Sequence, residues 1–249
     1  RDFDCVNESR PGVTSVILKP GEALERIDEV VDKMKHIKVV GIAGPGDPLA
    51  NPETFATLRL VHEKYPDTIL CISTNGLLLP DKIDELEKYG VRNITITLNA
   101  IDPVIGENIY TFVEYGGKKY YGREAAELLL SHQLAGIEEA VARKMLVKIN
   151  TVYIPGVNDA HIPEIAKKVG AMGVFNFNII PLIPQYKFKD ITPPTPVEKA
   201  HMHELCAPYV RQMRHCQRCR ADAVGLLGKD VKNEFGCCSK GDRSDHGCQ

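Results

Sequence analysis

Short apolar runs alternate with helix-like segments along most of the chain. The strand-like runs occupy residues 38–43, 68–73, 92–98, 146–153 and 174–180. Parallel strands need a crossover connection, which is usually a helix, so this alternation predicts βα units around a parallel sheet, either open or curled into a barrel. Ligand sites in such folds lie at the carboxyl ends of the strands. The sequence therefore predicts an α/β protein.

The segments between these strands carry apolar residues at helical spacing. Helices are predicted over 21–36, 52–65, 80–89, 124–143, 160–171 and 196–214. The stretch 102–123 interrupts the alternation with a longer insert rich in tyrosine and glycine. The Pro-rich residues 184–196 are predicted to be extended.

The charge balance and hydropathy pattern exclude several partner classes. Among 249 residues there are 31 Lys and Arg and 33 Asp and Glu, giving a formal net charge of -2. That balance lacks the basic surface typical of nucleic-acid-binding proteins. The sequence has no run of roughly 18 apolar residues, which is the length that a membrane helix needs. The charged start, Arg1-Asp2-Phe3, does not resemble a signal peptide. We therefore expect a cytoplasmic protein with neither nucleic-acid nor membrane partners.

A loop with two glycines, two prolines and an acid follows the first predicted strand. It reads Gly44-Pro45-Gly46-Asp47-Pro48 and precedes a helix that begins near residue 52. Glycine permits close approach of the backbone to a ligand, and proline stiffens the loop. The loop fits neither Gly-x-Gly-x-x-Gly nor a P-loop, so a nucleotide-phosphate site is not indicated. A small-molecule loop and an ordinary tight turn both remain open.

Polar residues recur at alternate positions of four predicted strands, so each set shares one face. The sets are Cys71, Ser73 and Asn75; Thr95, Thr97 and Asn99; Lys148 and Asn150; and Asn176 and Asn178. A parallel strand covered on both sides should be apolar on both faces. The pattern therefore favours a sheet curled around a ligand-filled or wet interior, with the solvated face of an open sheet as the alternative.

The eight cysteines are more consistent with metal binding or catalysis than with disulfides, because the chain is long and reads as a full α/β domain. Cys216-x-x-Cys219 can supply two thiolates to a metal but needs partners from elsewhere. A zinc ribbon is a poor match, because Cys237 and Cys238 are adjacent. Cys71 is either an inert packed thiol or a ligand on the polar face, and Cys206 is predicted to lie in the core.

Four motifs together resemble the NifB family of radical S-adenosylmethionine (SAM) enzymes, which build the carbide-containing iron–sulfur core of the nitrogenase cofactor. They are DCVNESRPGV at 4–13, GIAGPGDPLAN at 41–51, STNG at 73–76 and CQRCRADAVG at 216–225. They occur in family order, and the resemblance covers roughly residues 1–230.

The resemblance implies a partial (βα)6 TIM-like barrel of the radical SAM type over residues 1–183. A C-terminal extension with the Cys-x-x-Cys ligands would follow at 184–232, and a mobile tail at 233–249. The family's Cys-x-x-x-Cys-x-x-Cys motif and first barrel strand are expected just before Arg1. The chain would then resemble the short, stand-alone form without an appended cofactor-carrier domain.

The resemblance also implies a set of site residues. Gly44, Gly46 and Asp47 would hold the amino group of SAM. The ribose, carboxylate and adenine would be lined by Asn75, Thr97, Asn99, Asn150 and Val152. The two substrate [4Fe–4S] clusters would be bound by Cys5, Cys71, Cys216 and Cys219. Glu8 would contact a cluster or take part in proton transfer.

The implied activity is that of a lyase or methyl-transfer-type cofactor maturase. It would fuse two [4Fe–4S] clusters around a carbide taken from SAM, giving the [8Fe–9S–C] precursor of the nitrogenase cofactor. A third [4Fe–4S] cluster, which cleaves SAM, would be held by residues outside this chain. The expected partners are iron–sulfur cluster donors and a downstream cofactor carrier or nitrogenase assembly scaffold. The alternatives are another radical SAM maturase or a peptide-modifying enzyme with an auxiliary cluster, a non-catalytic iron–sulfur scaffold, and a zinc-stabilised α/β domain.

Overall fold

A computed structural model describes residues 18–34, 38–42, 46–213, 225–226 and 229–230. Its centre is a five-stranded sheet in which all neighbouring strands are parallel, in the order β1-β2-β3-β6-β7. The strands are β1 (Val39–Ile42), β2 (Ile69–Thr74), β3 (Val91–Thr97), β6 (Leu146–Tyr153) and β7 (Asn176–Pro181). The predicted α/β class with a parallel sheet is confirmed.

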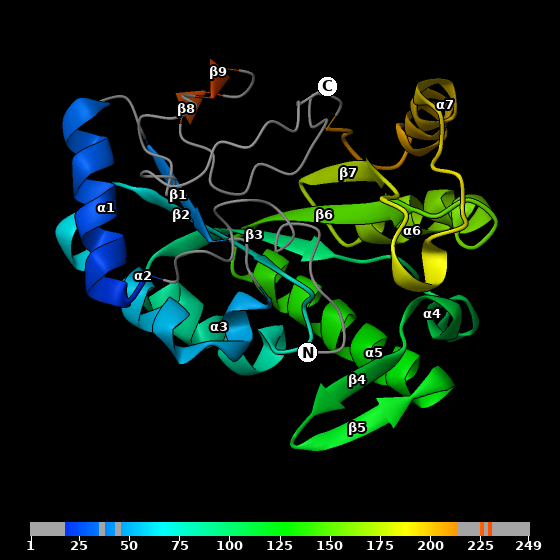
Figure 1. The fold of residues 1–249 in the computed structure, drawn as a ribbon, viewed down its shortest axis with the longest axis horizontal. Coiled ribbons are helices and arrows are strands. Elements are labelled where there is room, and N and C mark those ends of the chain that lie inside the picture. The colour runs from blue at the N-terminus through cyan, green and yellow to red at the C-terminus, as the bar shows by residue number, and fades with distance from the viewer. Residues whose placement is uncertain (1–17, 35–37, 43–45, 214–224, 227–228, 231–249) are drawn as a thin grey trace, which may run out of the picture.

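Helices connect successive strands of this sheet. Their bounds are α1 (Pro20–Lys33), α2 (Pro52–Lys64), α3 (Leu79–Lys88), α4 (Pro103–Ile109), α5 (Gly122–Ala142), α6 (Ile162–Ala171) and α7 (Pro196–Cys206), with single 3-10 turns at Pro48–Ala50, Asp159–His161 and Tyr186–Phe188. Figure 1 shows α2, α3 and α5 along one side of the sheet, with α1 beside α2 and with α6 and α7 near β7.

The ends of these helices follow local chemistry. Pro52 is the first residue of α2, where its missing N–H costs no hydrogen bond, and the Asn51 side chain accepts from the backbone N–H of Glu53 at 3.0 Å. After α3 the chain turns at Gly90, whose φ of 75° lies in the left-handed region. That conformation requires glycine, and a Cβ there would also approach the His62 ring to 2.5 Å, so the ring would have to move.

Helix α7 is shorter than the predicted helix over 196–214, because it ends at Cys206. Pro208 lacks a backbone N–H and so cannot continue the helical hydrogen bonding. The chain instead returns to the sheet edge, where Phe177 donates its N–H to Arg211 O at 2.8 Å and Met213 donates to Phe177 O at 2.8 Å. At this turn the backbone of Tyr209 lies directly on Gly170 of α6, so closely that a Cβ at 170 would collide with the Tyr209 carbonyl.

The insert at 102–123 forms α4 and a hairpin of β4 (Phe112–Tyr115) and β5 (Lys118–Tyr121). The turn between the strands uses Gly116 and Gly117, with φ values of 60° and 75°. Two consecutive left-handed residues match the preferred turn of a tight hairpin. In Figure 1 the hairpin lies beside one end of α5.

The two faces of the sheet differ in burial. On one face lie apolar residues with at most 1% exposure, which pack against the helices; among them are Ile72, Ile94, Ile96, Ile149 and Phe177. Burial of such side chains contributes roughly 1.5–3 kcal/mol each, which makes this layer the main core. On the other face, alternate residues of β2, β3 and β6 are only half-buried. The helices therefore cover one face and leave the opposite face to a different role.

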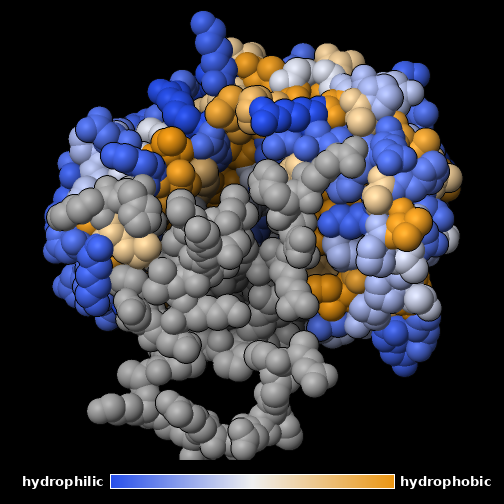
Figure 2. All heavy atoms as spheres, turned by 90° about the horizontal axis from the view of Figure 1, so that it is seen from above, coloured by the Kyte–Doolittle hydropathy of each residue, from blue (hydrophilic) through white to orange (hydrophobic). Residues whose placement is uncertain are grey.

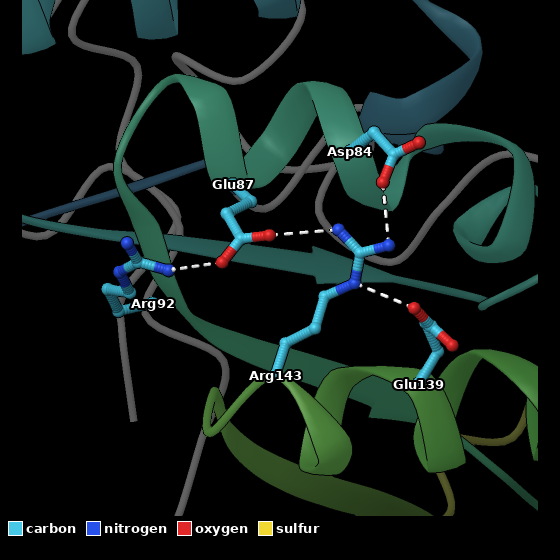
Figure 3. Close-up of polar contacts among 5 residues, drawn as sticks. All are labelled: Asp84, Glu87, Arg92, Glu139 and Arg143. Atoms are coloured by element: carbon cyan, nitrogen blue, oxygen red, sulfur yellow. Dashed lines mark hydrogen bonds and ion pairs between the residues drawn. The ribbon is translucent and has the colours of Figure 1, made fainter.

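Charged side chains join neighbouring elements at the amino-terminal edge of the sheet. The Arg143 guanidinium contacts Asp84 at 2.6 Å, Glu87 at 2.9 Å and Glu139 at 2.7 Å, and Glu87 also contacts Arg92 at 3.0 Å. Figure 3 shows that the five side chains come from α3, from the start of β3 and from the end of α5. The hydrogen bonds from Arg92 and Arg143 lower the pKa of Glu87.

The visible surface is mixed in character. Figure 2 shows separate hydrophobic patches among hydrophilic side chains on the face seen from above. Single exposed apolar residues are normal on globular proteins and need no functional explanation. In the part of the chain that the structure describes, no helix is both long and apolar enough to span a membrane. A short antiparallel pair, β8 (Gly225–Leu226) with β9 (Lys229–Asp230), completes the described elements.

Candidate functional site

The face of the sheet that the helices leave uncovered is polar, as the alternation of residues predicts. Parallel pairing brings these residues into register across the strands. The first row joins Cys71 to Asn93, the second Ser73, Thr95, Lys148 and Asn176, and the third Thr97, Asn150 and Asn178. Two residues of a strand span roughly 6.6 Å, so neighbouring rows lie one such step apart. The third row is nearest the carboxyl ends of the strands.

The glycine loop is attached to the end of β2 by the Asp47 carboxylate. Asp47 Oδ1 accepts from the Leu49 N–H at 3.0 Å, and Oδ2 accepts from the Asn75 N–H at 2.6 Å. The Thr74 hydroxyl donates to both carboxylate oxygens, at 3.0 and 2.8 Å. Gly46 has a φ of 77°, a conformation that favours glycine. The structure thus gives Asp47 an intramolecular role in placing the loop, and its contact with SAM stays a prediction.

Gln133 of α5 joins the carboxyl ends of β2 and β3. Its side chain is only 1% exposed, and its amide donates to Asn75 O at 2.7 Å and to Thr97 O at 2.9 Å. Between these carbonyls the chain turns at Gly76, with φ of 84°, where a Cβ would approach Gln133 to 3.1 Å. Gln133 thereby fixes two predicted SAM contacts. Sequence reasoning missed it, although a lone amide on the apolar stripe of a predicted helix is a usable signal.

Asn158 joins the carboxyl ends of β3 and β6. It is 1% exposed, and its amide donates to Asn99 O at 3.0 Å and to Val152 O at 2.9 Å, while its carbonyl accepts from the Ile154 N–H at 2.8 Å. Asn99 in turn accepts the Val152 N–H at 2.9 Å through Oδ1. Asn99 and Val152 are therefore fixed to each other. Sequence reasoning gave Asn158 no role.

Asn150 lies in the third row and contacts Asn178 of the neighbouring strand. Asn178 Nδ2 donates to Asn150 Oδ1 at 3.1 Å. The Asn178 Oδ1 atom is buried and has no hydrogen-bond partner among the residues that the structure describes, which is uncommon for a buried polar atom. On the opposite face of β6, the Thr151 hydroxyl donates to Leu98 O at 2.6 Å. Three predicted SAM contacts, Thr97, Asn150 and Val152, thus lie on the adjacent strands β3 and β6, and Asn99 follows the end of β3.

Cys71 lies half-buried on the polar face, and Cys206 lies in the core, as predicted for Cys206. Burial raises the pKa of the Cys71 thiol, against smaller opposing effects from the hydrogen bond with Asn93 and the positive charge of Lys148. Burial raises the pKa of Cys206 to about 12. A metal must displace the thiol proton to bind at such a site. The position of Cys71 suits a ligand, whereas that of Cys206 suits packing.

Several predicted site residues lie outside the described residues, namely Cys5, Glu8, Gly44, Cys216 and Cys219. Among the residues that the structure describes, no three His, Cys, Asp or Glu side chains gather as a metal site. A hollow of about 340 Å³ lined by Leu49, Phe55 and Lys82, among others, contains none of the predicted site residues. We therefore place the candidate site on the polar face and not in this hollow.

Comparison with known proteins gives consistent results. Residues 5–169 match the Radical SAM superfamily. The FeMo cofactor biosynthesis protein NifB of Frankia alni is 46% identical over 246 residues, covering 94% of this chain and 48% of that protein. The protein of the same name from Chlorobaculum tepidum is 47% identical over 238 residues, covering 94% and 56%. The chain thus spans about half the length of the curated relatives it matches.

A solved structure shares the fold. Streptococcus suis SuiB superposes with a TM-score of 0.59 at 13% sequence identity, covering 80% of this chain and 44% of that one. At this identity the likeness concerns the fold alone. Together with the superfamily match and the parallel sheet, it confirms the predicted fold class, a partial TIM-like barrel of the radical SAM type.

Proposed function

Because the chain belongs to the radical SAM superfamily, we propose that it binds SAM at the carboxyl ends of β2, β3 and β6 and uses it in radical chemistry. The residues there fit such a ligand. Thr97 and Asn150 are paired in register, and Asn75 and Asn99 lie just beyond the ends of their strands. Amide and hydroxyl groups on a half-buried face can bond the polar groups of a nucleoside and an amino acid.

The proposed substrates besides SAM are two [4Fe–4S] clusters, which the enzyme fuses around a SAM-derived carbide to give the [8Fe–9S–C] precursor of the nitrogenase cofactor. The name of the curated relatives, FeMo cofactor biosynthesis protein NifB, supports this choice. The observation that carries it is the position of Cys71. Its thiol shares the polar face with the predicted SAM contacts, one row below Ser73 and two below Thr97. A thiolate at that place can hold an iron atom beside the cofactor.

The described residues act mainly by positioning. A [4Fe–4S] cluster, when bound by the family's cysteine motif, supplies the electron that cleaves SAM. Asp47 and Gln133 fix the loop and strand ends that contact SAM, and Asn158 fixes Asn99 against Val152. Cys71 orients a substrate cluster toward the same place. Holding reactants in a fixed geometry is a large source of rate acceleration, and a preorganised site needs little rearrangement.

The remaining roles rest on the resemblance. Cys5, Cys216 and Cys219 complete the ligands of the substrate clusters, and Glu8 contacts a cluster or transfers a proton. The reaction is of the lyase or methyl-transfer type. Iron–sulfur cluster donors supply the substrate clusters, and a cofactor carrier or nitrogenase assembly scaffold receives the product in the cytoplasm.

The test compares the two cysteines that the structure describes, Cys71 and Cys206, in anaerobically reconstituted full-length protein that includes the cysteine motif for the SAM-cleaving cluster. With SAM and a reductant, the wild type should form 5′-deoxyadenosine, S-adenosylhomocysteine and the fused iron product. Chromatography and spectroscopy detect these products. Cys71→Ala should still cleave SAM but lose the fused product, because only a substrate-cluster ligand is removed. Cys206→Ala is the matched control, since its thiol packs in the core, and it should retain both activities.

Three results would contradict the proposal. If Cys71→Ala formed as much fused product as the wild type, Cys71 would not be a ligand. SAM cleavage by the wild type without a fused iron product would indicate another maturase. Bound iron with no SAM cleavage would indicate a scaffold.

A further inference from the structure

The second row of the polar face consists of side chains whose hydrogen-bond donors have no partner among the described residues. Ser73, Thr95, Lys148 and Asn176 are in register on four adjacent strands, and each is half-buried. Within the described part of the chain, no hydrogen bond or ion pair involves the Ser73 hydroxyl, the Thr95 hydroxyl or the Lys148 ammonium. Asn176 Oδ1 accepts from the Phe177 N–H at 3.0 Å, which leaves the Asn176 amide N–H groups as donors.

The described strands contribute charge of one sign to this face. None of the five strands β1, β2, β3, β6 and β7 contains Asp or Glu. Lys148 is therefore a half-buried cation on a face to which the strands contribute no carboxylate. A desolvated charge is costly unless a counter-charge approaches it. A row of hydroxyl, ammonium and amide donors around one positive charge is suited to an anion.

The position of the row indicates which anion it serves. Cys71 lies one row below it, and Thr97 and Asn150, the predicted SAM contacts, lie one row above. The row is thus between the thiol and the proposed SAM site. An iron–sulfur fragment with thiolate ligands carries net negative charge, and its sulfides accept hydrogen bonds that stabilise the cluster.

We propose that Ser73, Thr95, Lys148 and Asn176 form an anion-binding row that holds the sulfide side of the iron–sulfur fragment ligated by Cys71. This inference rests on the proposed function and adds to it a group of positioning residues. Lys148 supplies the charge, and the three neutral donors fix the orientation of the fragment. The row contributes no iron ligand and no reacting group.

The experiment follows iron retention in the full chain, without using catalytic activity as the readout. Wild type and variants are reconstituted anaerobically with ferrous iron and sulfide, and the loss of iron to a chelator is timed. Lys148→Met should lose the iron that depends on Cys71 about tenfold faster, because a unit charge within roughly 10 Å of the fragment is removed. Lys148→Arg should behave like the wild type, and Thr95→Val should show a smaller acceleration of about twofold to threefold.

Matched controls separate this effect from general damage. Lys167→Met removes an exposed lysine of α6 and should leave iron retention unchanged. The melting temperatures of the Lys148 variants before reconstitution should equal that of the wild type. The Cys71-dependent iron is defined as the difference between wild type and Cys71→Ala.

The outcomes are distinct from those of the functional test. Iron loss from Lys148→Met at the wild-type rate would overturn the inference even if the wild type forms the fused product. Weaker SAM binding by Lys148→Met with unchanged iron retention would also overturn it and assign the row to the SAM carboxylate. Faster iron loss from Lys148→Met alone, in a protein that does not cleave SAM, would support the row while contradicting the proposed function.

Discussion

At the amino-terminal edge of the sheet the side chains that join neighbouring elements are charged and partly exposed. At the carboxyl-terminal edge the two amides that join neighbouring strands are neutral and buried, and the Asp47 carboxylate holds the loop beside them. Arg143 and its three carboxylates belong to the first kind, and the side chain of Asp84 is 86% exposed. Gln133 and Asn158, each 1% exposed, belong to the second. His161 also lies at the carboxyl-terminal edge. Burial lowers its pKa, which favours the neutral ring, and its Nε2 accepts from the Ile101 N–H at 3.0 Å.

This difference means that the contacts at the amino-terminal edge can adjust, whereas those at the carboxyl-terminal edge are fixed. Exposed ion pairs are worth little individually, because water and salt screen them and their side chains are free to move. A buried amide that bonds backbone groups leaves those groups unsatisfied when it is removed, at a cost of about 1–3 kcal/mol each. Gln133 and Asn158 themselves add no charge where a sulfonium cofactor and an anionic cluster are proposed to bind. The carboxyl edge is therefore the rigid one, and it carries the site.

The largest effect is expected at Asn158. Replacement by leucine keeps the approximate size but leaves the Ile154 N–H and the carbonyls of Asn99 and Val152 without their partner. We expect the free energy of unfolding to fall by about 3 kcal/mol or more, measured by urea denaturation. Asn108→Ala, which removes an exposed amide on α4, is the control and should change it by less than about 0.5 kcal/mol. A loss below about 1 kcal/mol for Asn158→Leu would contradict the rigid-edge interpretation.

An intermediate effect is expected at Gln133. Gln133→Leu removes the donors to Asn75 O and Thr97 O, so the free energy of unfolding should fall by about 2 kcal/mol. Both carbonyls belong to predicted SAM contacts, so SAM binding by the folded variant should also weaken, as measured by equilibrium dialysis. Ser131→Ala on the exposed side of the same helix should alter neither quantity. If Gln133→Leu bound SAM with the same affinity as the wild type, Gln133 would not position the site.

The smallest effect is expected at Arg143. Arg143→Ala breaks contacts with Asp84, Glu87 and Glu139 that are partly exposed to solvent, so the melting temperature at pH 7 should fall by only about 1–3 °C. The folded state lowers the pKa of Glu87 below its ordinary value of 4.5. Its stabilisation is therefore present above about pH 4.5 and is lost as the pH falls through the lower folded pKa. The difference between wild type and variant should shrink below pH 4.5 and in high salt.

A contrary result at Arg143 would also be informative. If Arg143→Ala destabilised the protein as much as Asn158→Leu at every pH, the two edges would be equally rigid. The contrast drawn above would then be wrong.

Local patterns in the sequence predict much of this architecture. Apolar periodicity locates all five sheet strands, and alternation places Thr97 and Asn150 on one face, which the register confirms. The helix predicted over 196–214 fails because its last part obeys a non-local rule, the pairing of 211–213 with Phe177. The sequence marks 102–123 only as an insert, although its Gly116-Gly117 pair is a signal for the hairpin turn.

The two buried amides that support the site, Gln133 and Asn158, are harder to predict, for a physical reason. Gln133 bonds residues 58 and 36 positions away along the chain, and Asn158 reaches Asn99 across 59 positions. Such partners are fixed by the packing of α5 and of the β6 turn on the sheet, and periodicity carries no information about them. Alternation could find the face that holds a ligand, but not the side chains behind it.

The contact between Gly170 and the Tyr209 carbonyl brings one backbone directly against another, with no side chain between them. Elsewhere in a protein a small displacement can be absorbed by a change of rotamer, and here no rotamer exists to absorb it. A shift of residues 209–210 toward α6 is therefore opposed directly by the helix backbone at Gly170, and α6 packs on β6 through the core. The segment after α7 is in this way coupled to the sheet through α6.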